Sequence, residues 1–245
     1  MRPIVLIPAR LAASRLPGKP LADIGGQPMI VRVLRQAEAA NVGPVAVAAG
    51  DAEIGEAVAA AGGRAVLTDP DLPSGSDRIL AALATLDPHG HHDVIVNLQG
   101  DIPFLDPLLL ADCVGLLERQ ADVDIATLIA PEGSPAERTD PDCPKAVMAM
   151  AADGRSGRAL YFTRSTLYGD GPVWRHIGVY AYRRPALDRF AAAPPSALER
   201  REKLEQLRAL ELGMTIGAVA AAAMPIEVNT PAELEIARAH AETVA

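Results

Sequence analysis

The stretch "PIVLIPARLAASRLPGKP", Pro3–Pro20, opens with a run of aliphatic residues and continues into a cationic loop. An apolar run without alternation is typical of a strand that is buried on both faces, as in a parallel sheet. The loop carries Arg10, Arg15 and Lys19, although the chain of 245 residues has a formal net charge of −8. Ligands of open α/β sheets bind outside the carboxyl ends of the strands. We therefore expect a site for a polyanion, such as a triphosphate, where this strand ends.

The first half of the chain predicts an α/β fold with an open, mainly parallel sheet and helices on both faces. Aliphatic runs alternate there with helical patterns, which is the order that parallel sheets produce. After the first strand at Pro3–Ala9, the expected strands are 44–49, 64–68, 93–98 and 124–130, and the expected helices are 29–40, 52–61, 76–86 and 107–119.

The second half of the chain predicts a mixed part of the sheet and further helices. Two strands flank a glycine-rich turn at Asp153–Gly157, and "HIGVYAYR", 176–183, has the pattern of another strand. The charged segment "ALERREKLEQLRAL", 197–210, has the pattern of a surface helix. Capping-box patterns at Ser196 and Thr230 mark two helix starts. No linker or repeat interrupts the chain, so we expect a single domain.

The composition excludes several classes of protein. Apolar residues are 49% of the chain and aromatic residues only 3%, so the core is expected to be aliphatic. The acidic balance argues against a nucleic-acid binder. The two cysteines, Cys113 and Cys143, form no CxxC pattern, which argues against zinc and disulfides and favours a reducing compartment. With no apolar run of membrane-spanning length, we expect a cytoplasmic protein that binds neither nucleic acid nor membrane.

A second polar segment follows the strand in "VIVNLQGD", Val94–Asp101. Asp101 is expected at the same sheet edge as the cationic loop, and Mg²⁺ usually takes one or two carboxylates together with phosphate oxygens. Neither segment is decisive alone, because a cationic loop is often merely solvated and an Asp after a strand is often a turn residue. The GxxxxGK[ST] and GxGxxG motifs are absent, which excludes the two commonest nucleotide-binding loops.

Eight motifs together give the chain a resemblance to a known family. In chain order they are "IPAR", "SRLPGKPL", "SGSDR", "VNLQGD", "ALYFTR", "RHIGVYAYR", "LEQLR" and "NTPAELE". The chain resembles the bacterial 3-deoxy-manno-octulosonate (Kdo) cytidylyltransferases, the CMP-Kdo synthetases. The resemblance implies a GT-A-like, Rossmann-like nucleotidyltransferase fold that forms one domain over residues 1–245. The mixed part from about residue 145 would contribute sugar binding and dimer contacts.

The implied reaction joins CTP and Kdo to CMP-Kdo, with release of pyrophosphate, for lipopolysaccharide biosynthesis. The implied cofactor is Mg²⁺, the small-molecule partners are CTP and Kdo, and the assembly is a homodimer. Catalysis would rest on Arg10, Lys19 and Asp101. Nucleotide binding would involve Pro8, Ala9, Arg10, Ser14, Arg15, Lys19, Ser74, Gly75, Arg78 and Gln99. Sugar binding would involve Arg164, His176, Tyr180, Glu205 and Gln206, and the metal ligands would be Asp101 and Asn229.

Three departures from the family pattern keep alternatives open. Ile102 replaces an acidic residue that commonly follows "QGD", Asn229 replaces a metal-binding Asp, and the segment 165–174 is short. Glu227 is expected on the same strand face as Asn229 and is a candidate to compensate. The alternatives are a cytidylyltransferase for another 2-keto sugar acid, such as amino-Kdo or sialic acid, and a nucleotide-binding paralogue with impaired catalysis. Without the resemblance, His176 and Tyr180 would be interpreted as an ordinary buried pair.

Overall fold

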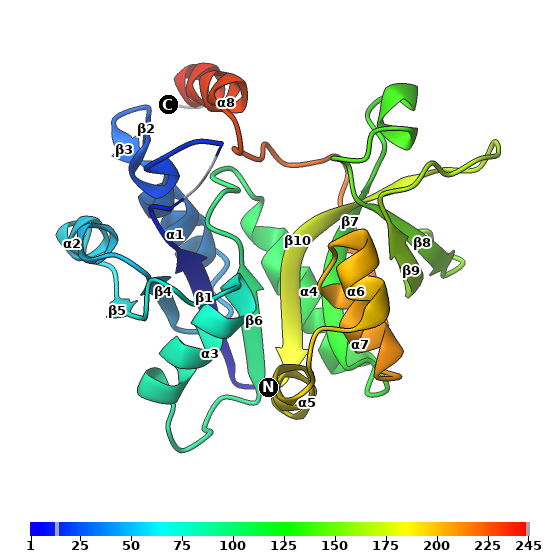
Figure 1. The fold of residues 1–245 in the computed structure, drawn as a ribbon, viewed down its shortest axis with the longest axis horizontal. Helices are drawn as coiled ribbons and strands as arrows, with labels where there is room; N and C mark the ends of the chain where they lie inside the picture. Colours follow the sequence, from blue (N-terminus) through cyan, green and yellow to red (C-terminus); the bar gives the residue numbers. More distant parts are fainter. Residues whose placement is uncertain (13–14, 244–245) are drawn as a thin grey trace. The chain divides into compact units, whose positions relative to one another are not determined.

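The computed structural model describes residues 1–12 and 15–243 (Figure 1). The chain forms two compact units, one of Met1–Ala111 with Pro225–Ala245 and one of Asp112–Met224. The expectation of one nucleotidyltransferase domain stays a prediction, and the second unit begins upstream of the mixed part expected from about residue 145. None of the described helices is long and apolar enough to cross a membrane.

The first unit is built around a parallel sheet. Its strands follow the order β5-β4-β1-β6, and every neighbouring pair is parallel. The strands are β1 (Pro3–Ala9), β4 (Val45–Ala49), β5 (Ala65–Leu67) and β6 (Val94–Leu98). The helices are α1 (Met29–Ala39), α2 (Ala52–Ala60), α3 (Gly75–Leu86) and α8 (Pro231–Thr243), and α4 (Pro107–Arg119) includes the boundary with the second unit. A short helix η1 (Lys19–Leu21) and a hairpin of β2 (Asp23–Ile24) and β3 (Gln27–Pro28) complete it.

Strand β1 explains why this sheet forms. Every residue from Ile4 to Ala9 is buried, as the unbroken apolar run predicts for a strand that is covered on both faces. Because β4 pairs on one side of β1 and β6 on the other, the chain reverses its direction of travel through the sheet at β1. The carboxyl ends of β1 and β6 therefore lie at one edge, beside a topological switch point where such sheets bind ligands.

The second unit has a mixed sheet with the order β10-β7-β11-β9-β8, and the first residues of β10 also pair with β8. Only β7 and β11 are parallel among these pairs of described strands. The strands are β7 (Ile125–Pro131), β8 (Lys145–Met150), β9 (Ser156–Thr163), β10 (Trp174–Arg183) and β11 (Ile216–Ala220). The helices are η2 (Pro135–Arg138), α5 (Arg184–Ala192), α6 (Ala197–Glu202) and α7 (Gln206–Glu211).

The expected continuous helix over 197–210 is wrong. Lys203 adopts a left-handed conformation with φ of 55°, which ends α6, and a new helix begins at Gln206. The break turns Leu204 and Leu207 into the core, where their exposed fractions are 6% and 0%. Burial of these side chains therefore overrides the helical propensity of the charged segment.

Other expectations for the second half are partly confirmed. The capping box at Ser196 is present, with both of its reciprocal hydrogen bonds. The turn expected over Asp153–Gly157 is shorter, because β9 already begins at Ser156. Helix α5 and strand β11 were not expected.

Strands β10 and β7 form a β-bulge, where their register shifts between Ile177 and Tyr180. Buried polar groups form a chain of hydrogen bonds at this bulge. The Gln206 amide Nε2 lies 3.4 Å from His176 Nδ1, and His176 Nε2 lies 3.0 Å from the Thr127 hydroxyl. That hydroxyl donates to the carbonyl of Val179 at 2.7 Å, where the register of β10 and β7 shifts. The hydroxyl therefore accepts from His176 Nε2, and the amide donates to Nδ1. This direction of donation requires a neutral imidazole, and burial lowers the pKa of His176 to about 3.

The buried imidazole predicts a stability that falls in mild acid. Its pKa is about 3 in the folded protein and 6.5 for the ordinary group, so between these values only the unfolded chain takes up the proton. The free energy of unfolding should decrease as the pH falls below 6.5, by up to about 1.4 kcal/mol per pH unit from this group. Urea unfolding of wild type and His176→Gln over this range measures the slope. We expect a flatter slope in His176→Gln and an unchanged one in the control His89→Gln, whose side chain is exposed.

Candidate active site

A cavity of about 430 Å³ opens at the carboxyl edge of the first unit's sheet. This volume lies within the range of about 300–1,000 Å³ that is common for small-molecule sites. Every predicted nucleotide-binding residue that the structure describes lines the cavity, and so do both predicted metal ligands, Asp101 and Asn229. Ser14 lies outside the described residues. The structure therefore brings together a set of residues that the sequence spreads over more than two hundred positions.

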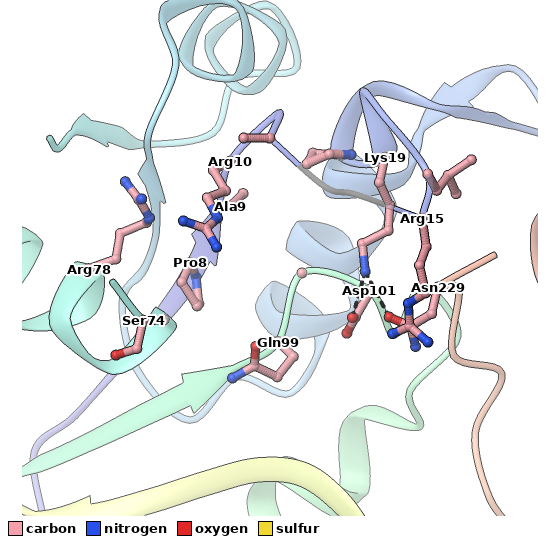
Figure 2. Close-up of a pocket in the computed structure, with 15 residues that line it drawn as sticks. Pro8, Ala9, Arg10, Arg15, Lys19, Ser74, Arg78, Gln99, Asp101 and Asn229 are labelled. Carbon is pink, nitrogen blue, oxygen red and sulfur yellow. Dashed lines mark hydrogen bonds and ion pairs between the residues drawn. The ribbon is translucent and has the colours of Figure 1, made fainter. Parts of the chain in front are cut away.

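The lining residues divide the cavity into two sides (Figure 2). Ser74 and Arg78 lie on one side, and Lys19, Asp101 and Asn229 lie on the other. Pro8, Ala9 and Gln99, from the ends of β1 and β6, lie between them. One side thus contains the hydroxyl of Ser74 and the guanidinium of Arg78, which is bonded to the protein, and the other contains the ammonium group of Lys19 with the oxygens of Asp101 and Asn229.

Two glycines allow the backbone segments around this cavity to approach closely. A Cβ atom on Gly100 would lie 3.1 Å from the carbonyl oxygen of Pro8 and 3.4 Å from Ile30 Cδ1. A Cβ atom on Gly75 would lie 3.3 Å from Pro8 Cγ. The turn after β6 and the start of α3 therefore both pack against the end of β1.

The start of helix α3 forms one wall of the cavity. Ser74 caps the helix, since its hydroxyl accepts from the Asp77 amide at 3.1 Å and donates to the Asp77 carboxylate at 2.7 Å. One turn later, the Arg78 guanidinium donates to the Thr68 hydroxyl at 2.7 Å and to the carbonyls of Asp69 and Pro70. Burial, followed by the nearby charge of Arg10, lowers the pKa of Arg78. Arg78 therefore shapes the wall, because its hydrogen bonds are made within the protein.

The cationic loop is anchored at both of its described ends. The amide of Leu11 donates to the carboxylate of Asp51 at 2.7 Å, and the amide of Gly18 donates to the carbonyl of Leu11 at 3.2 Å. Gly18 has a φ of 70°, which lets the loop turn into η1. Arg10 and Arg15 keep their side chains exposed beside the cavity. The anchors fix the backbone, while the two guanidinium groups stay available to an anion.

Asp51 is a site residue that the sequence analysis did not identify. It follows β4 in "AAGD", as Asp101 follows β6 in "LQGD", so a Gly-Asp pair after each strand was the available signal. Both carboxylates bind the cationic loop, one through a backbone amide and the other through Lys19.

Lys19 connects three segments on the charged side of the cavity (Figure 2). Its ammonium group donates to Asp101 Oδ2 at 2.8 Å and to Asn229 Oδ1 at 3.1 Å. The amide of Val228 donates to the carbonyl of Asp101 at 2.9 Å, which places the segment before α8 beside the end of β6. Glu233 in turn accepts from the amides of Asn229 and Thr230, both at 2.8 Å, so the capping box predicted at Thr230 also holds Asn229 in place.

The oxygen atoms that meet at Lys19 fit a magnesium ion that arrives with a nucleotide. Asp101 Oδ2 and Asn229 Oδ1 both point at one cation, and Mg²⁺ commonly takes one or two protein oxygens together with phosphate oxygens and water. A site made of protein ligands alone fits poorly, because the described residues contain no group of three or more His, Cys, Asp or Glu that would hold a metal. Ile102 is 1% exposed and lies in the core, so this position offers no further ligand.

The predicted sugar-binding residues all belong to the second unit, where the structure places them in two groups. His176, Tyr180 and Gln206 lie together, with ring centroids of the first two 5.4 Å apart. Burial, followed by the charges of Tyr182 and Glu205, raises the pKa of the Tyr180 phenol well above 10.0, so Glu205 belongs to this group. The roles of these four residues in sugar binding stay predictions. Both ring nitrogens of His176 already have protein partners.

Arg164 forms the second group of the predicted sugar-binding residues. Its side chain donates from Nε to the carbonyl of Glu202 at 3.1 Å and from Nη1 to the carbonyl of Pro141 at 2.8 Å. The neighbouring Lys145 is fully buried and donates to the carbonyl of Arg164. Its ammonium group therefore acts on the protein backbone.

Comparison with known proteins agrees with these features. The profile of the cytidylyltransferase family matches residues 4–216. The chain is 59% identical to the 3-deoxy-manno-octulosonate cytidylyltransferase of Rhodospirillum centenum, over 97% of this chain and 92% of that protein. It is 58% identical to the protein of the same name from Parvibaculum lavamentivorans, again over 97% of this chain and 92% of that protein.

Solved structures support the same relationship. A CMP:2-keto-3-deoxy-manno-octonic acid synthetase complexed with CTP has a TM-score of 0.91 and 36% identity, over 100% of both chains. A nucleotidyl transferase from Methanothermobacter, at a TM-score of 0.66 and 18% identity over 100% of this chain and 99% of that one, is similar in fold alone. The predicted nucleotidyltransferase fold is confirmed. Since both the family profile and these relatives extend over most of its length, the chain belongs to the 3-deoxy-manno-octulosonate cytidylyltransferase family.

Proposed function

We propose that the protein transfers the CMP group of CTP to Kdo and releases pyrophosphate. The observation that carries this proposal is the two-sided cavity, in which Arg10, Arg15 and Lys19 surround the edge where β1 and β6 end. These three cations suit a triphosphate, and the polar side chains of Ser74 and Gln99 suit a pyrimidine base. A relative of 36% identity was solved in complex with CTP, and the curated relatives carry the name of the Kdo enzyme.

The chemistry of the transfer needs positioning and charge neutralisation. The anomeric hydroxyl of the sugar acid attacks the α-phosphorus and loses its proton, while the bond from that phosphorus to the pyrophosphate oxygen breaks in line. Arg10 and Arg15 are exposed at the cavity and would bind the charged oxygens of the triphosphate. Lys19 would break its hydrogen bond to Asp101 and donate to a phosphate oxygen instead. Magnesium, held by Asp101 and Asn229, would supply further positive charge to the phosphates.

Lys19 sets the condition under which the metal would bind. Its ammonium group occupies the point at which the Asp101 and Asn229 oxygens meet. The positive charge of Lys19 cancels the negative charge of Asp101, and Asn229 is neutral, so the three side chains together carry no net charge. A carboxylate at position 229 would leave the same group with one negative charge. We therefore propose that free Mg²⁺ is held weakly, and that a triphosphate opens the site when it draws Lys19 away.

The names of the relatives favour Kdo over the other 2-keto sugar acids considered from the sequence. We extend the proposal to a homodimer, a cytoplasmic setting and a role in lipopolysaccharide biosynthesis. The impaired paralogue is not favoured, because Ile102 lies in the core and Asn229 still presents an amide oxygen beside Asp101.

Substrate selectivity tests the proposed function directly. Pyrophosphate release should occur with CTP and Kdo, and it should be far slower with ATP or GTP, because the space between Gln99 and the Pro8–Arg10 backbone suits a small base. Omitting the sugar or supplying sialic acid serves as the control. Equal turnover with purine triphosphates, or with sialic acid in place of Kdo, would contradict the proposal, and no turnover with any sugar acid would favour the impaired paralogue.

Arg15→Ala should weaken CTP binding roughly tenfold to a hundredfold, since a hydrogen bond to a charged group contributes about 1.5–3 kcal/mol. Arg15 is exposed, so the thermal unfolding midpoint should stay the same. Isothermal titration with CTP measures the affinity. Arg155→Ala, at an exposed turn of the second unit, is the matched control and should bind CTP normally. Equal affinities in both variants would mean that the cationic loop is only solvated.

Asn229→Asp should create a metal site that no longer depends on the nucleotide. The variant adds one negative charge beside Asp101, so Mn²⁺ binding without CTP, followed by electron paramagnetic resonance, should become tighter than in wild type. The magnesium concentration for half-maximal turnover should fall. Lys19→Met, which removes the competing ammonium, should also bind Mn²⁺ more tightly without CTP, whereas Asp101→Asn should bind less. If neither Asn229→Asp nor Lys19→Met changes Mn²⁺ binding, the metal does not bind at this point.

A further inference from the structure

We infer that Glu202 is a positioning residue, which together with the buried ammonium group of Lys145 holds Arg164 in the conformation that receives the carboxylate of the sugar acid. The inference rests on the proposed function, because it takes Arg164 as the partner of that carboxylate. All of the residues concerned belong to the second unit.

Glu202 binds both the backbone and the side chain of Arg164. Its carboxylate Oε2 accepts from the Arg164 amide at 3.1 Å and from the Thr163 hydroxyl at 3.0 Å. Its backbone carbonyl accepts from Arg164 Nε, also at 3.1 Å. The second carboxylate oxygen accepts from Tyr161 and Arg201. The end of β9 is therefore fixed to the last residue of α6 through several hydrogen bonds of one residue.

Lys145 holds the other side of the same residue. Its ammonium group donates to the carbonyl of Arg164 at 3.1 Å and to the carbonyl of Asp140 at 2.7 Å. The backbone amide of Arg164 therefore donates to a carboxylate, and its backbone carbonyl accepts from an ammonium group. Hydrogen bonds to charged groups are roughly twice as strong as neutral ones, so this arrangement fixes the main chain of Arg164 firmly.

The cost of burying these charges indicates that the position of Arg164 matters. The side chain of Glu202 is 10% exposed and Lys145 is fully buried, and each loses hydration on folding. Burial opposes ionisation of Glu202, but the hydrogen bonds from the Arg164 amide and the Thr163 hydroxyl outweigh it and keep the pKa of the carboxyl below its ordinary value. Burial lowers the pKa of Lys145. A neutral hydrogen-bonding pair would fix the end of a strand at a smaller desolvation cost.

The guanidinium group of Arg164 is oriented by these contacts and remains able to bind an anion. Nε and Nη1 donate to the carbonyl oxygens of Glu202 and Pro141, which fix the plane of the group without neutralising its charge. Neither of these two hydrogen bonds uses Nη2, so a ligand can bind at this edge of the guanidinium group. A carboxylate prefers a planar guanidinium edge of fixed orientation, which reduces the entropy lost on binding.

Glu202→Gln tests the inference, with Glu199→Gln as a matched control. Both glutamates lie in α6 and have side chains that are 10% exposed, but Glu199 pairs with Arg208 instead of contacting Arg164. Glu202→Gln should raise the KM for Kdo roughly tenfold, the effect of weakening one charge-assisted hydrogen bond, and leave the Kd for CTP unchanged. Lys145→Met should change the KM for Kdo in the same direction. Glu199→Gln should lower the unfolding midpoint and leave the KM for Kdo near that of wild type.

A double-mutant cycle with Arg164→Ala separates positioning from general destabilisation. Arg164→Ala should raise the KM for Kdo, and Glu202→Gln should then cause no further increase. Should Glu202→Gln fail to fold, Glu202→Asp, which keeps the charge but moves the carboxylate, enters the same cycle.

The failures of the two proposals can be distinguished. An unchanged KM for Kdo in Glu202→Gln, an equal rise in Glu199→Gln, or additive effects in the cycle would overturn the positioning role. An unchanged KM in Arg164→Ala would overturn the role of Arg164 itself. The absence of turnover by wild type with Kdo would overturn the proposed function, and with it the premise of this inference.

Discussion

The hydrogen bonds of one ammonium group connect three segments of the candidate active site that are far apart in the sequence. Lys19 contacts Asp101, 82 positions away, and Asn229, 210 positions away. The second contact depends on helix α8, whose buried residues pack with Ile24 and Met29 in one hydrophobic cluster that also contains Val228. Hydrophobic packing of the C-terminal segment on the start of the chain therefore delivers Asn229 to the cavity, although residues 112–224 of the second unit intervene in the sequence.

The two units use charge in different ways. In the cavity of the first unit, Arg10 and Arg15 remain exposed, so they keep most of their hydration until an anion replaces it. In the second unit, the buried ammonium group of Lys145 donates to backbone carbonyls, and the largely buried carboxylate of Glu202 accepts from a backbone amide, hydroxyls and the guanidinium of Arg201. Exposed cations suit a ligand that binds and leaves, whereas buried charges suit a fixed geometry. His176 completes this contrast, since its buried ring is neutral and its two nitrogens hold the bulge of the sheet.

The sequence predicted much of the cavity, because its residues follow buried strands directly. The apolar runs before Arg10 and Gln99 identified two parallel strands, and parallel strands carry their carboxyl ends to one edge. It did not identify Asp51 or Glu202 as site residues. Asp51 acts through a backbone amide of the cationic loop, and its only signal was the Gly-Asp pair after β4. Glu202 acts through the backbone of Arg164, a contact that has no pattern of side-chain types.

The sequence by itself determined the elements whose signals are local. The burial of β1 on both faces and the apolar face of α1 follow from the spacing of apolar residues, and the cap at Ser196 follows from two residues three positions apart. Only the tertiary structure decided the break of the charged helix at Lys203, because the burial of Leu204 depends on the packing around it. It also decided which cation meets Asp101. Such contacts depend on packing between distant segments, which no local spacing of residues encodes.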